Sequence, residues 1–386
     1  MDVKTRAREV CEGVGDKLIA LSHRIHAHPE LGFEERQAAR WLCEALADAG
    51  FAVEAPLCDL ETAFVARAGS GPLHVAICAE YDCLPGIGHA CGHNIIAAMA
   101  LGAGIAAARI ADEVGLRLSV IGTPAEEVGN NGGKILLLER GAFAGVHAAM
   151  MVHPAPIDML KPAMIANSTF DVLYTGKEAH ASGFPELGIN AADALTVAQT
   201  AIGLLRQHMR PTDRVHGIVT KGGDAPNIVP AHTAAKFMVR AETLRDLDDI
   251  RGKVFRCFEA GALATGAKLE IVGGDKPYAE MVYDGDISEL YRRNAERLGR
   301  GFIELPGTQR AAASTDMGNV SLAIPAIHPL IGIASLPAVN HQPEFTAQCV
   351  TSAADKAVLD GSIAMAWTLI DMAQDSRLCA RLTSGA

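Results

Sequence analysis

The sequence predicts an α/β protein with a second, α+β domain inserted into the first. With 386 residues, the chain exceeds the size at which one hydrophobic core usually keeps growing, so we expect two domains. Strands and helices alternate over Leu73–Val152, as in an α/β layer with a largely parallel sheet. After His153 the expected order is strand-helix-strand-strand-helix-strand, which is typical of a ferredoxin-like domain. We place the first domain, with a mixed sheet flanked by helices, at 1–165 and 275–386, and the inserted domain at 166–274.

Composition excludes several classes of protein. Apolar residues make up 49% of the chain and charged residues 20%, as in soluble globular proteins. The net charge of -11 argues against a nucleic-acid partner, which requires a basic surface. No apolar run is long enough to span a membrane, and the first ten residues lack the apolar core of a signal peptide. We therefore expect a cytoplasmic protein, and its nine cysteines are expected to be mostly reduced core thiols.

The elements of the first domain follow from apolar spacing and from breaker residues. Apolar residues recur at close to helical spacing over Asp2–His28, and Pro29 ends that segment. Glu34–Ala49 is an amphipathic helix that Gly50 closes. Asn94 is expected to cap the apolar helix that follows it. The other elements expected here are strands at 51–55, 62–68, 73–79, 116–122, 146–152 and 323–328, and helices at 95–111, 133–140, 286–298 and 347–372.

The inserted domain is predicted from a change of pattern after His153. The segment Met164–Tyr174 alternates between apolar and polar residues, like a half-exposed strand. The elements expected after it are a helix at 190–207, strands at 215–221 and 233–240, a helix at 244–264 and a strand at 268–272.

Potential metal ligands and acids follow three strands of the first domain. The strand 73–79 leads to Asp82, Cys91 and His93, the strand 116–122 leads to Glu126 and Glu127, and the strand 146–152 leads to His153. If these strands are parallel, their carboxyl ends lie at one edge of the sheet, where open α/β sheets place their chemistry. Thiolate and imidazole are ligand types that suit zinc and related metals. The convergence therefore predicts a metal site at this edge.

Several potential site residues, taken alone, also have a plainer explanation. Glu126 and Glu127 could be acids at a helix N-terminus, which the helix dipole favours. His153 could be a polar residue at a strand end, and Asp82 could close a turn. His341 could be a surface histidine before a proline.

Six motifs, spread over most of the chain, resemble those of the M20 metallopeptidase family: HRIHAHPELGFEE, EYDCLPGIGHACGHN, GTPAEE, GKEAHAS, GGDAPNIVP and NHQPEF. The similarity is to the amidohydrolase branch of the family, which includes aminoacylases, aminobenzoyl-glutamate hydrolases and the aminoacylase-1-like-2 dipeptidases. The resemblance implies a zinc-aminopeptidase-like catalytic domain and an inserted lid that also mediates dimerisation. A homodimer or higher homo-oligomer is therefore expected.

The resemblance also implies a binuclear metal centre. Two divalent metal ions are expected, zinc on grounds of ligand softness, with manganese or cobalt as alternatives. Cys91 stands where many relatives have a bridging aspartate, and Asp82 suits the orientation of a histidine ring. The residues that match the ligand positions are Cys91, His93, Glu127, His153 and His341.

Four further residues match catalytic or substrate-binding positions. Glu126 matches the general base, and His180 matches a histidine that reaches across the dimer to the tetrahedral intermediate. Asn227 and Arg240 match positions that hold the carboxylate of the substrate. By themselves, His180, Asn227 and Arg240 would be read as a hairpin-end residue, a turn former and a solvated strand end. Two roles are open. Cys83 replaces an expected alanine and is either inert packing or an oxidisable neighbour of Cys91, and His89 either competes as a ligand or, as we expect, faces the substrate or packs.

The resulting hypothesis is metal-assisted hydrolysis of an amide bond. Glu126 would accept a proton from a metal-activated water and pass it to the departing amine. The expected substrate carries a free carboxylate and is an N-acyl amino acid or an aminobenzoyl-glutamate-like amide, or alternatively a dipeptide. A non-catalytic metal-dependent binding protein is a distant alternative, because such a protein has no need of Glu126. The chain contains no G-x-G-x-x-G after a strand and no G-x-S-x-G, so dinucleotide and serine-hydrolase chemistry are not expected.

Overall fold

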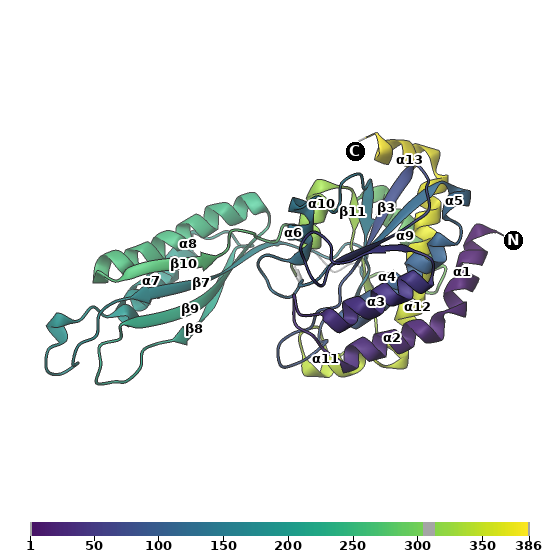
Figure 1. Ribbon diagram of the computed structural model, residues 1–386. Coiled ribbons are helices and arrows are strands. Elements are labelled where there is room, and N and C mark those ends of the chain that lie inside the picture. The colour runs from purple at the N-terminus through teal and green to yellow at the C-terminus, as the bar shows by residue number, and fades with distance from the viewer. Residues whose placement is uncertain (1, 304–312, 385–386) are drawn as a thin grey trace. The chain divides into compact units, whose positions relative to one another are not determined.

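The computed structural model describes residues 2–303 and 313–384. The chain forms two compact units (Figure 1). Unit 1 contains Met1–Val128, Gly132–Ala163 and Met281–Ala386, and unit 2 contains Gly129–Asn131 and Met164–Glu280.

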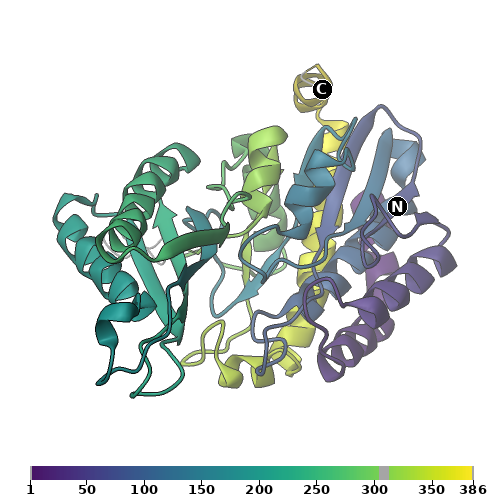
Figure 2. The same cartoon turned by 60° about the vertical axis from the view of Figure 1, so that its left-hand side comes forward.

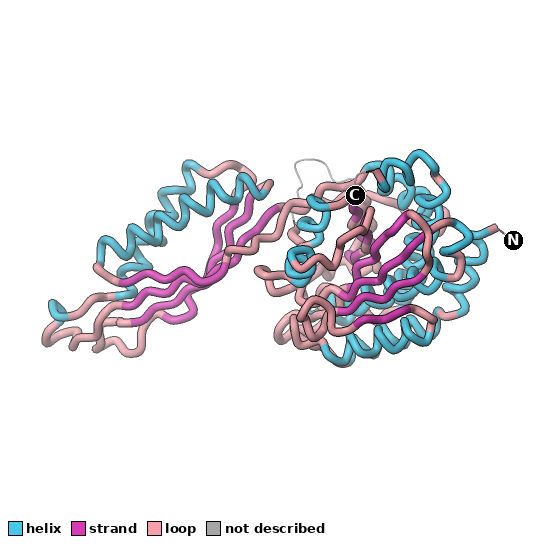
Figure 3. Tube along the Cα trace, turned by 45° about the horizontal axis from the view of Figure 1, so that its top comes forward, coloured by secondary structure: helices cyan, strands magenta, loops and turns pink. Residues whose placement is uncertain are grey.

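Unit 1 is built on a six-stranded mixed sheet with strand order β1-β2-β4-β3-β5-β11. Figure 3 shows its strands flanked by helices. Strands β3, β4, β5 and β11 run parallel to one another, whereas β1 and β2 pair antiparallel. All seven residues of β3 are buried, as in a parallel strand that is covered on both faces. The strands are β1 Ala52–Glu54, β2 Phe64–Ala68, β3 Leu73–Ala79, β4 Leu116–Gly122, β5 Ala148–Met150 and β11 Ala326–Ile327.

Helices surround this sheet, and α4 forms the centre of the core. It packs against α2 and α12 (Figure 1). Nearly the whole helix is buried, which fits its apolar residues on every side. The α/β class predicted from the sequence is confirmed. The helices of unit 1 are α1 Val3–Gly13, α2 Gly15–Ala27, α3 Arg36–Asp48, α4 His93–Ala108, α5 Ala111–Val114, α6 Gly133–Glu139, α9 Gly285–Glu296, α10 Met317–Ala323, α11 Pro343–Gln348, α12 Ser352–Gln374 and α13 Ser376–Thr383.

The start of α4 differs from the prediction. The cap is Gly92 with φ 80°, and Asn94 lies inside the helix, where its amide donates to Ser22 Oγ and to the Cys349 carbonyl. Two features exclude a side chain at position 92. A Cβ there would lie 2.5 Å from Cγ of Pro154, and the backbone of Gly92 has a left-handed φ. The glycine thus turns the chain sharply between its two neighbours, Cys91 and His93.

Several predicted segments are interrupted in the structure. The helix predicted at 347–372 contains the end of α11 and most of α12, and the helix predicted at 95–111 ends with α4 at Ala108. The segment predicted at 2–28 forms two helices, α1 and α2, which meet at Val14. The strand predicted at 146–152 is the short β5, and β6 His153–Ala155 then pairs with β12 Leu330–Gly332 in a separate two-stranded sheet. The segment predicted as a strand at 323–328 contains the end of α10 and the two residues of β11.

Unit 2 has the element order of the predicted ferredoxin-like domain. Its sheet has the order β10-β7-β9-β8, with every neighbour antiparallel, and α7 and α8 cover one face (Figure 2). Its core contains the aromatic rings of Phe170, Tyr174, Phe237 and Phe258. The elements are β7 Ala166–Thr175, α7 Ala191–Leu205, β8 Arg214–Lys221, β9 His232–Ala241, α8 Leu244–Thr265 and β10 Lys268–Gly273, with short 3₁₀ helices at Pro185–Leu187 and Arg206–His208.

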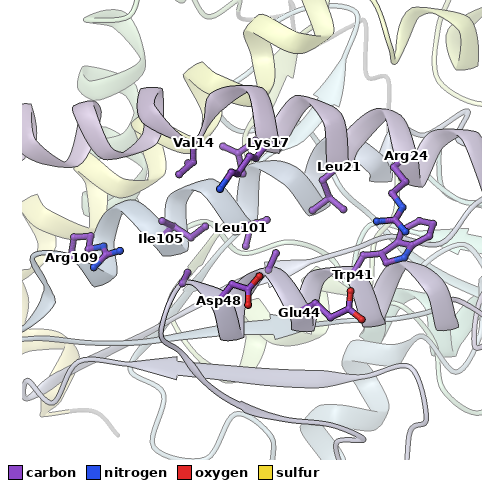
Figure 4. Close-up of a pocket in the computed structure, with 13 residues that line it drawn as sticks. Val14, Lys17, Leu21, Arg24, Trp41, Glu44, Asp48, Leu101, Ile105 and Arg109 are labelled. Atoms are coloured by element: carbon purple, nitrogen blue, oxygen red, sulfur yellow. The ribbon is translucent and has the colours of Figure 1, made fainter.

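A pocket of about 400 Å³ lies between α2, α3 and the C-terminal half of α4 (Figure 4). Its rim carries cations such as Lys17 and carboxylates such as Asp48, and Arg24 stacks over the ring of Trp41 at 3.9 Å. None of the residues that line it was predicted to act in the site.

Among the described residues, no helix is long and apolar enough to cross a membrane. The cytoplasmic location expected from the sequence stays a prediction.

Candidate metal centre

The predicted ligands come together at the carboxyl edge of the parallel strands of unit 1. The loop after β3 carries Cys91, the loop after β4 carries Glu127, and His153 begins β6, three residues after the end of β5. Because β3, β4 and β5 are parallel neighbours, their ends meet at one edge. His341 joins them from the segment before α11, where its backbone N–H donates to the Ala90 carbonyl.

Two groups of donor atoms share the thiol of Cys91. Cys91, His93 and His153 form one group, and Cys91, Glu127 and His341 form the other, with all donor atoms of a group within 4.8 Å of one another. Within the first group, Cys91 Sγ lies 3.4 Å from His153 Nε2. Within the second, His341 Nε2 lies 3.6 Å from Glu127 Oε1. A thiolate that belongs to both groups is placed where it could bridge two divalent ions.

Asp82 fixes the orientation of two of these residues. Its Oδ1 lies 2.7 Å from Nδ1 of the His93 ring, and its Oδ2 accepts a hydrogen bond of 2.9 Å from the backbone N–H of Glu127. Nε2 of His93 is buried and has no hydrogen-bond partner in the described part of the chain. A carboxylate that holds one ring nitrogen and leaves the other free is the usual partner of a metal-binding histidine.

Glu126 lies in a turn that a second carboxylate supports. Its neighbour Ala125 has a left-handed φ of 58°, and the Ala125 backbone N–H donates a 2.7 Å hydrogen bond to Glu35 Oε1. The hydroxyl of Thr62 donates to the other oxygen of Glu35 at 2.8 Å. Glu35 is fully buried and was not among the predicted site residues, although it lies in the first of the six motifs.

Buried carboxyl groups gather around this centre. Burial raises the pKa of the Glu126 carboxyl well above its ordinary value, and the neighbouring Glu80 and Glu127 raise it further. Burial alone would lower the pKa of His93, but Asp82 and Glu80 raise it well above its usual range. A buried ammonium group, that of Lys134, pairs with Glu80 and offsets part of the negative charge. Several carboxylates in one buried site favour bound cations.

The two remaining histidines of the donor groups differ in exposure. Burial lowers the pKa of His153 to about 3, which favours the neutral imidazole. The side chain of His341 is 58% exposed, and its backbone has a left-handed φ of 69°.

Cys83 and His89, whose roles the sequence left open, lie outside these donor groups. Cys83 is a buried free thiol, and burial raises its pKa to about 11. The His89 ring is buried and stacks on His26 at a centroid distance of 6.1 Å. The His89 ring therefore packs against α2.

The other three predicted residues belong to unit 2. His180 and Asn227 lie on paired segments, since the N–H of Ala181 donates to the Asn227 carbonyl at 3.0 Å. The ring Nδ1 of His180 accepts a 3.1 Å hydrogen bond from the N–H of Gly183, which orients the ring. Arg240 lies in β9 and is half-buried, and burial lowers its pKa.

Comparison with known proteins shows which family the chain resembles. The model of the peptidase dimerisation domain of the M20 peptidases matches residues 166–265. The chain is 38% identical to the mouse Xaa-Arg dipeptidase, over 96% of the chain and 89% of the relative. It is 33% identical to one of the subunits of the p-aminobenzoyl-glutamate hydrolase of Escherichia coli, over 65% of the chain and 56% of the relative.

Solved structures share the fold. A Bacillus subtilis dinuclear metal-binding peptidase of the M20 family has a TM-score of 0.68 and 22% identity, covering 93% of this chain and 99% of its own. A Klebsiella pneumoniae aminobenzoyl-glutamate utilization protein has a TM-score of 0.72 and 20% identity, covering 93% of this chain and 97% of its own. Together with the near full-length match to the mouse relative, these findings show that the chain belongs to the M20 family and is a metal-dependent hydrolase of amide bonds.

Proposed function

We propose that Cys91, His93, Glu127, His153 and His341 hold two divalent ions, with zinc as the resident metal. The observation that supports the proposal is the thiol of Cys91, which belongs to both donor groups. Buried donor atoms that find no hydrogen-bond partner among the described residues, such as His93 Nε2 and Glu127 Oε1, fit bound cations as well. When bound, such ions supply the Lewis acidity that lowers the pKa of water toward neutrality.

In this proposal the side chains divide the work of proton transfer and charge stabilisation. Glu126 accepts a proton from the attacking water and returns it to the amine that leaves. Burial raises the pKa of Glu126, which makes its carboxylate a stronger base for the proton of the water. His180 donates a hydrogen bond to the oxyanion of the tetrahedral intermediate.

The substrate that we propose is an amide whose amine portion is an amino acid with a free carboxylate. Arg240 would pair with that carboxylate through its planar guanidinium, and Asn227 would donate to it through its amide. Two substrate types fit this description, N-acyl amino acids and dipeptides. The identity to the mouse Xaa-Arg dipeptidase, which covers nearly the whole chain, favours a dipeptide with a basic C-terminal residue.

We further propose that unit 2 forms a homodimer. The family model that matches it describes a dimerisation domain. Its edge strand β8 also exposes large apolar side chains, with Ile218 65% and Val219 48% exposed. A second copy of the chain could cover such an exposed strand edge and its apolar side chains.

The experiment is an amino-acid release assay on matched substrates. The panel pairs alanyl-arginine with N-acetyl-arginine, and alanyl-glutamate with aminobenzoyl-glutamate. Metal-stripped protein is reloaded with zinc, manganese or cobalt, and Glu126→Gln is compared with Glu9→Gln, a change of an exposed glutamate on α1.

Turnover that requires metal and falls by about 10²- to 10⁴-fold in Glu126→Gln alone supports the mechanism. The dipeptidase proposal requires turnover of alanyl-arginine and little turnover of N-acetyl-arginine. Full activity in Glu126→Gln would show that another group is the base.

A further inference from the structure

A buried cluster of three charged side chains lies behind the metal centre. The ammonium of Lys134 donates to Glu80 Oε1 and to Asp316 Oδ1, each at 2.5 Å, and all three side chains are fully buried. The backbone N–H of Lys134 also donates to Asp316 Oδ2 at 2.9 Å. The cluster therefore joins the end of β3, the start of α6 and the residue before α10.

The cluster leaves one carboxylate oxygen without a hydrogen bond. Glu80 Oε2 is buried and accepts no hydrogen bond from any residue that the structure describes, which is costly for a carboxylate. Nε2 of His93 lies 3.3 Å from this oxygen, and it likewise has no hydrogen-bond partner within 2–303 and 313–384. Two buried atoms that could each bind a metal ion, Glu80 Oε2 and His93 Nε2, thus lie side by side without a hydrogen bond.

The 3.3 Å separation fits two ligands of one ion. Donor atoms bound to zinc at about 2.0–2.2 Å and at a tetrahedral angle lie about 3.3–3.5 Å apart. His93 has one ring nitrogen left for a metal, because Asp82 occupies the other, so it can bind one ion. The His93 ring belongs both to the group with Cys91 and His153 and to a group with Glu80 and Glu126. Both groups therefore surround the same ion.

We propose that Glu80 is a further ligand of the ion held by His93, and that Lys134 and Asp316 hold its carboxylate in place. This inference rests on the proposed binuclear centre. The ion then has a protein oxygen donor in addition to Cys91, His93 and His153. Lys134 offsets one of the two carboxylate charges of the cluster, so the remaining negative charge faces the ion.

The test uses cobalt as a spectroscopic probe in the full-length protein. Glu80→Gln keeps the size of the side chain but removes its charge, and Asp316→Asn removes a charge from the same cluster without changing a group that faces His93. Cobalt is titrated into each metal-stripped protein, and the visible spectrum and the two dissociation constants are recorded. The charge-transfer band of the thiolate of Cys91 reports that cobalt is bound.

If Glu80 is a ligand, Glu80→Gln alone changes the position and intensity of the cobalt d–d bands, because a ligand of the ion is replaced, and weakens the binding of one of the two ions by about tenfold or more. If Glu80→Gln and Asp316→Asn have the same unchanged spectrum, the cluster has only a structural role and the inference is wrong. A wild-type protein that fails to bind two cobalt ions would instead contradict the proposed centre itself.

Removal of a buried charge can prevent folding, so circular dichroism of each metal-stripped variant is measured first. Glu80→Asp, which keeps the charge but withdraws the oxygen, replaces Glu80→Gln if that variant does not fold. If neither folds, a crystal structure of the zinc-loaded wild type decides, since a bond to Glu80 Oε2 of about 2.0–2.2 Å is required.

Discussion

Cys91 is the residue on which both ions of the proposed centre depend. Because its thiol belongs to both donor groups, Cys91→Ala removes a ligand from each ion at once. We expect the zinc content of Cys91→Ala after dialysis to fall from two ions per chain to less than one. Elemental analysis by mass spectrometry measures this content directly.

Cys83→Ala is the matched control, because Cys83 is a buried free thiol on the same loop that lies outside the donor groups. Its zinc content should equal that of the wild type. Retention of both ions in Cys91→Ala would show that the thiol does not bridge them.

The sequence could single out residues that directly follow a predicted strand, but not contacts between distant positions. Cys91 and Glu127 follow strands, and the parallel pairing that unites their strand ends is a regular property of the α/β class. The contact between Lys134 and Asp316 joins positions 182 residues apart, and no periodicity sets that distance. Glu80 likewise reads as the polar end of an apolar strand until its partners are known.

At the scale of elements, Glu35 connects the start of α3 to the turn that carries Glu126. Its carboxylate holds the backbone of Ala125 and the hydroxyl of Thr62, so Glu35→Ala leaves a left-handed turn without its support. We expect kcat to fall by about 10²-fold in Glu35→Ala, because small displacements of a catalytic group are costly. Zinc content should stay at the wild-type value, since none of the proposed ligands changes.

Steady-state kinetics separates a positioning role from a loss of substrate binding. A positioning role lowers kcat with little change in KM, and Glu35→Gln, which retains an acceptor oxygen, should recover part of the activity. Glu34→Ala, a change of the neighbouring glutamate, which is not buried, serves as the control. Equal losses in the Glu34 and Glu35 variants would contradict the role.

The breaks between elements were harder to predict than the elements themselves. The apolar spacing over α1 and α2 is nearly continuous, and the interruption falls at Val14, between Gly13 and Gly15, a pair of glycines that the apolar pattern does not reveal. The start of α4 after Gly92 depends on the close approach of Pro154, which belongs to another segment of the chain. Strand and helix type follow from local pattern, whereas such boundaries follow from packing between distant segments.

At the scale of the molecule, a buried histidine makes the stability of unit 1 depend on pH. His74 lies in β3, with ring nitrogens 2.9 Å from the Gly145 carbonyl and 2.8 Å from Ser119 Oγ, and burial lowers its pKa to about 4. The unfolded chain, with a histidine pKa of about 6.5, binds more protons between about pH 6.5 and pH 4. This contribution to stability is therefore complete above about pH 6.5 and is lost as the pH falls toward 4.

Thermal unfolding of metal-stripped protein, followed by calorimetry from about pH 7 to pH 4, measures this dependence. We expect Tm to fall with pH and the fall to be smaller in His74→Asn, which cannot take up the proton. His28→Asn, a change of an exposed histidine in the same unit, should leave the slope unchanged. A slope that is the same in all three proteins would contradict the role of His74.

The assembly of two chains gives the last prediction, because the resemblance to the M20 family implies that His180 acts on the substrate bound by the partner chain. Mixed dimers of Glu126→Gln and His180→Ala then contain one site with an intact Glu126 from one chain and an intact His180 from the other. The second site in such a dimer lacks both groups. We therefore expect two inactive variants to regain up to about half of the wild-type activity per mixed dimer, since proton transfer and oxyanion stabilisation are both restored at one site.

The measurement is kcat after the two variants are co-expressed with different tags and the mixed dimer is purified on both tags. If His180 acts within its own chain, every site in the mixed dimer lacks one of the two groups, and the activity stays at the level of the single variants. Ile218→Lys, a change of an exposed residue of the edge strand β8, tests the interface independently. If β8 is the interface, this variant sediments as a monomer and keeps its zinc, and it loses activity only if His180 must come from the partner chain.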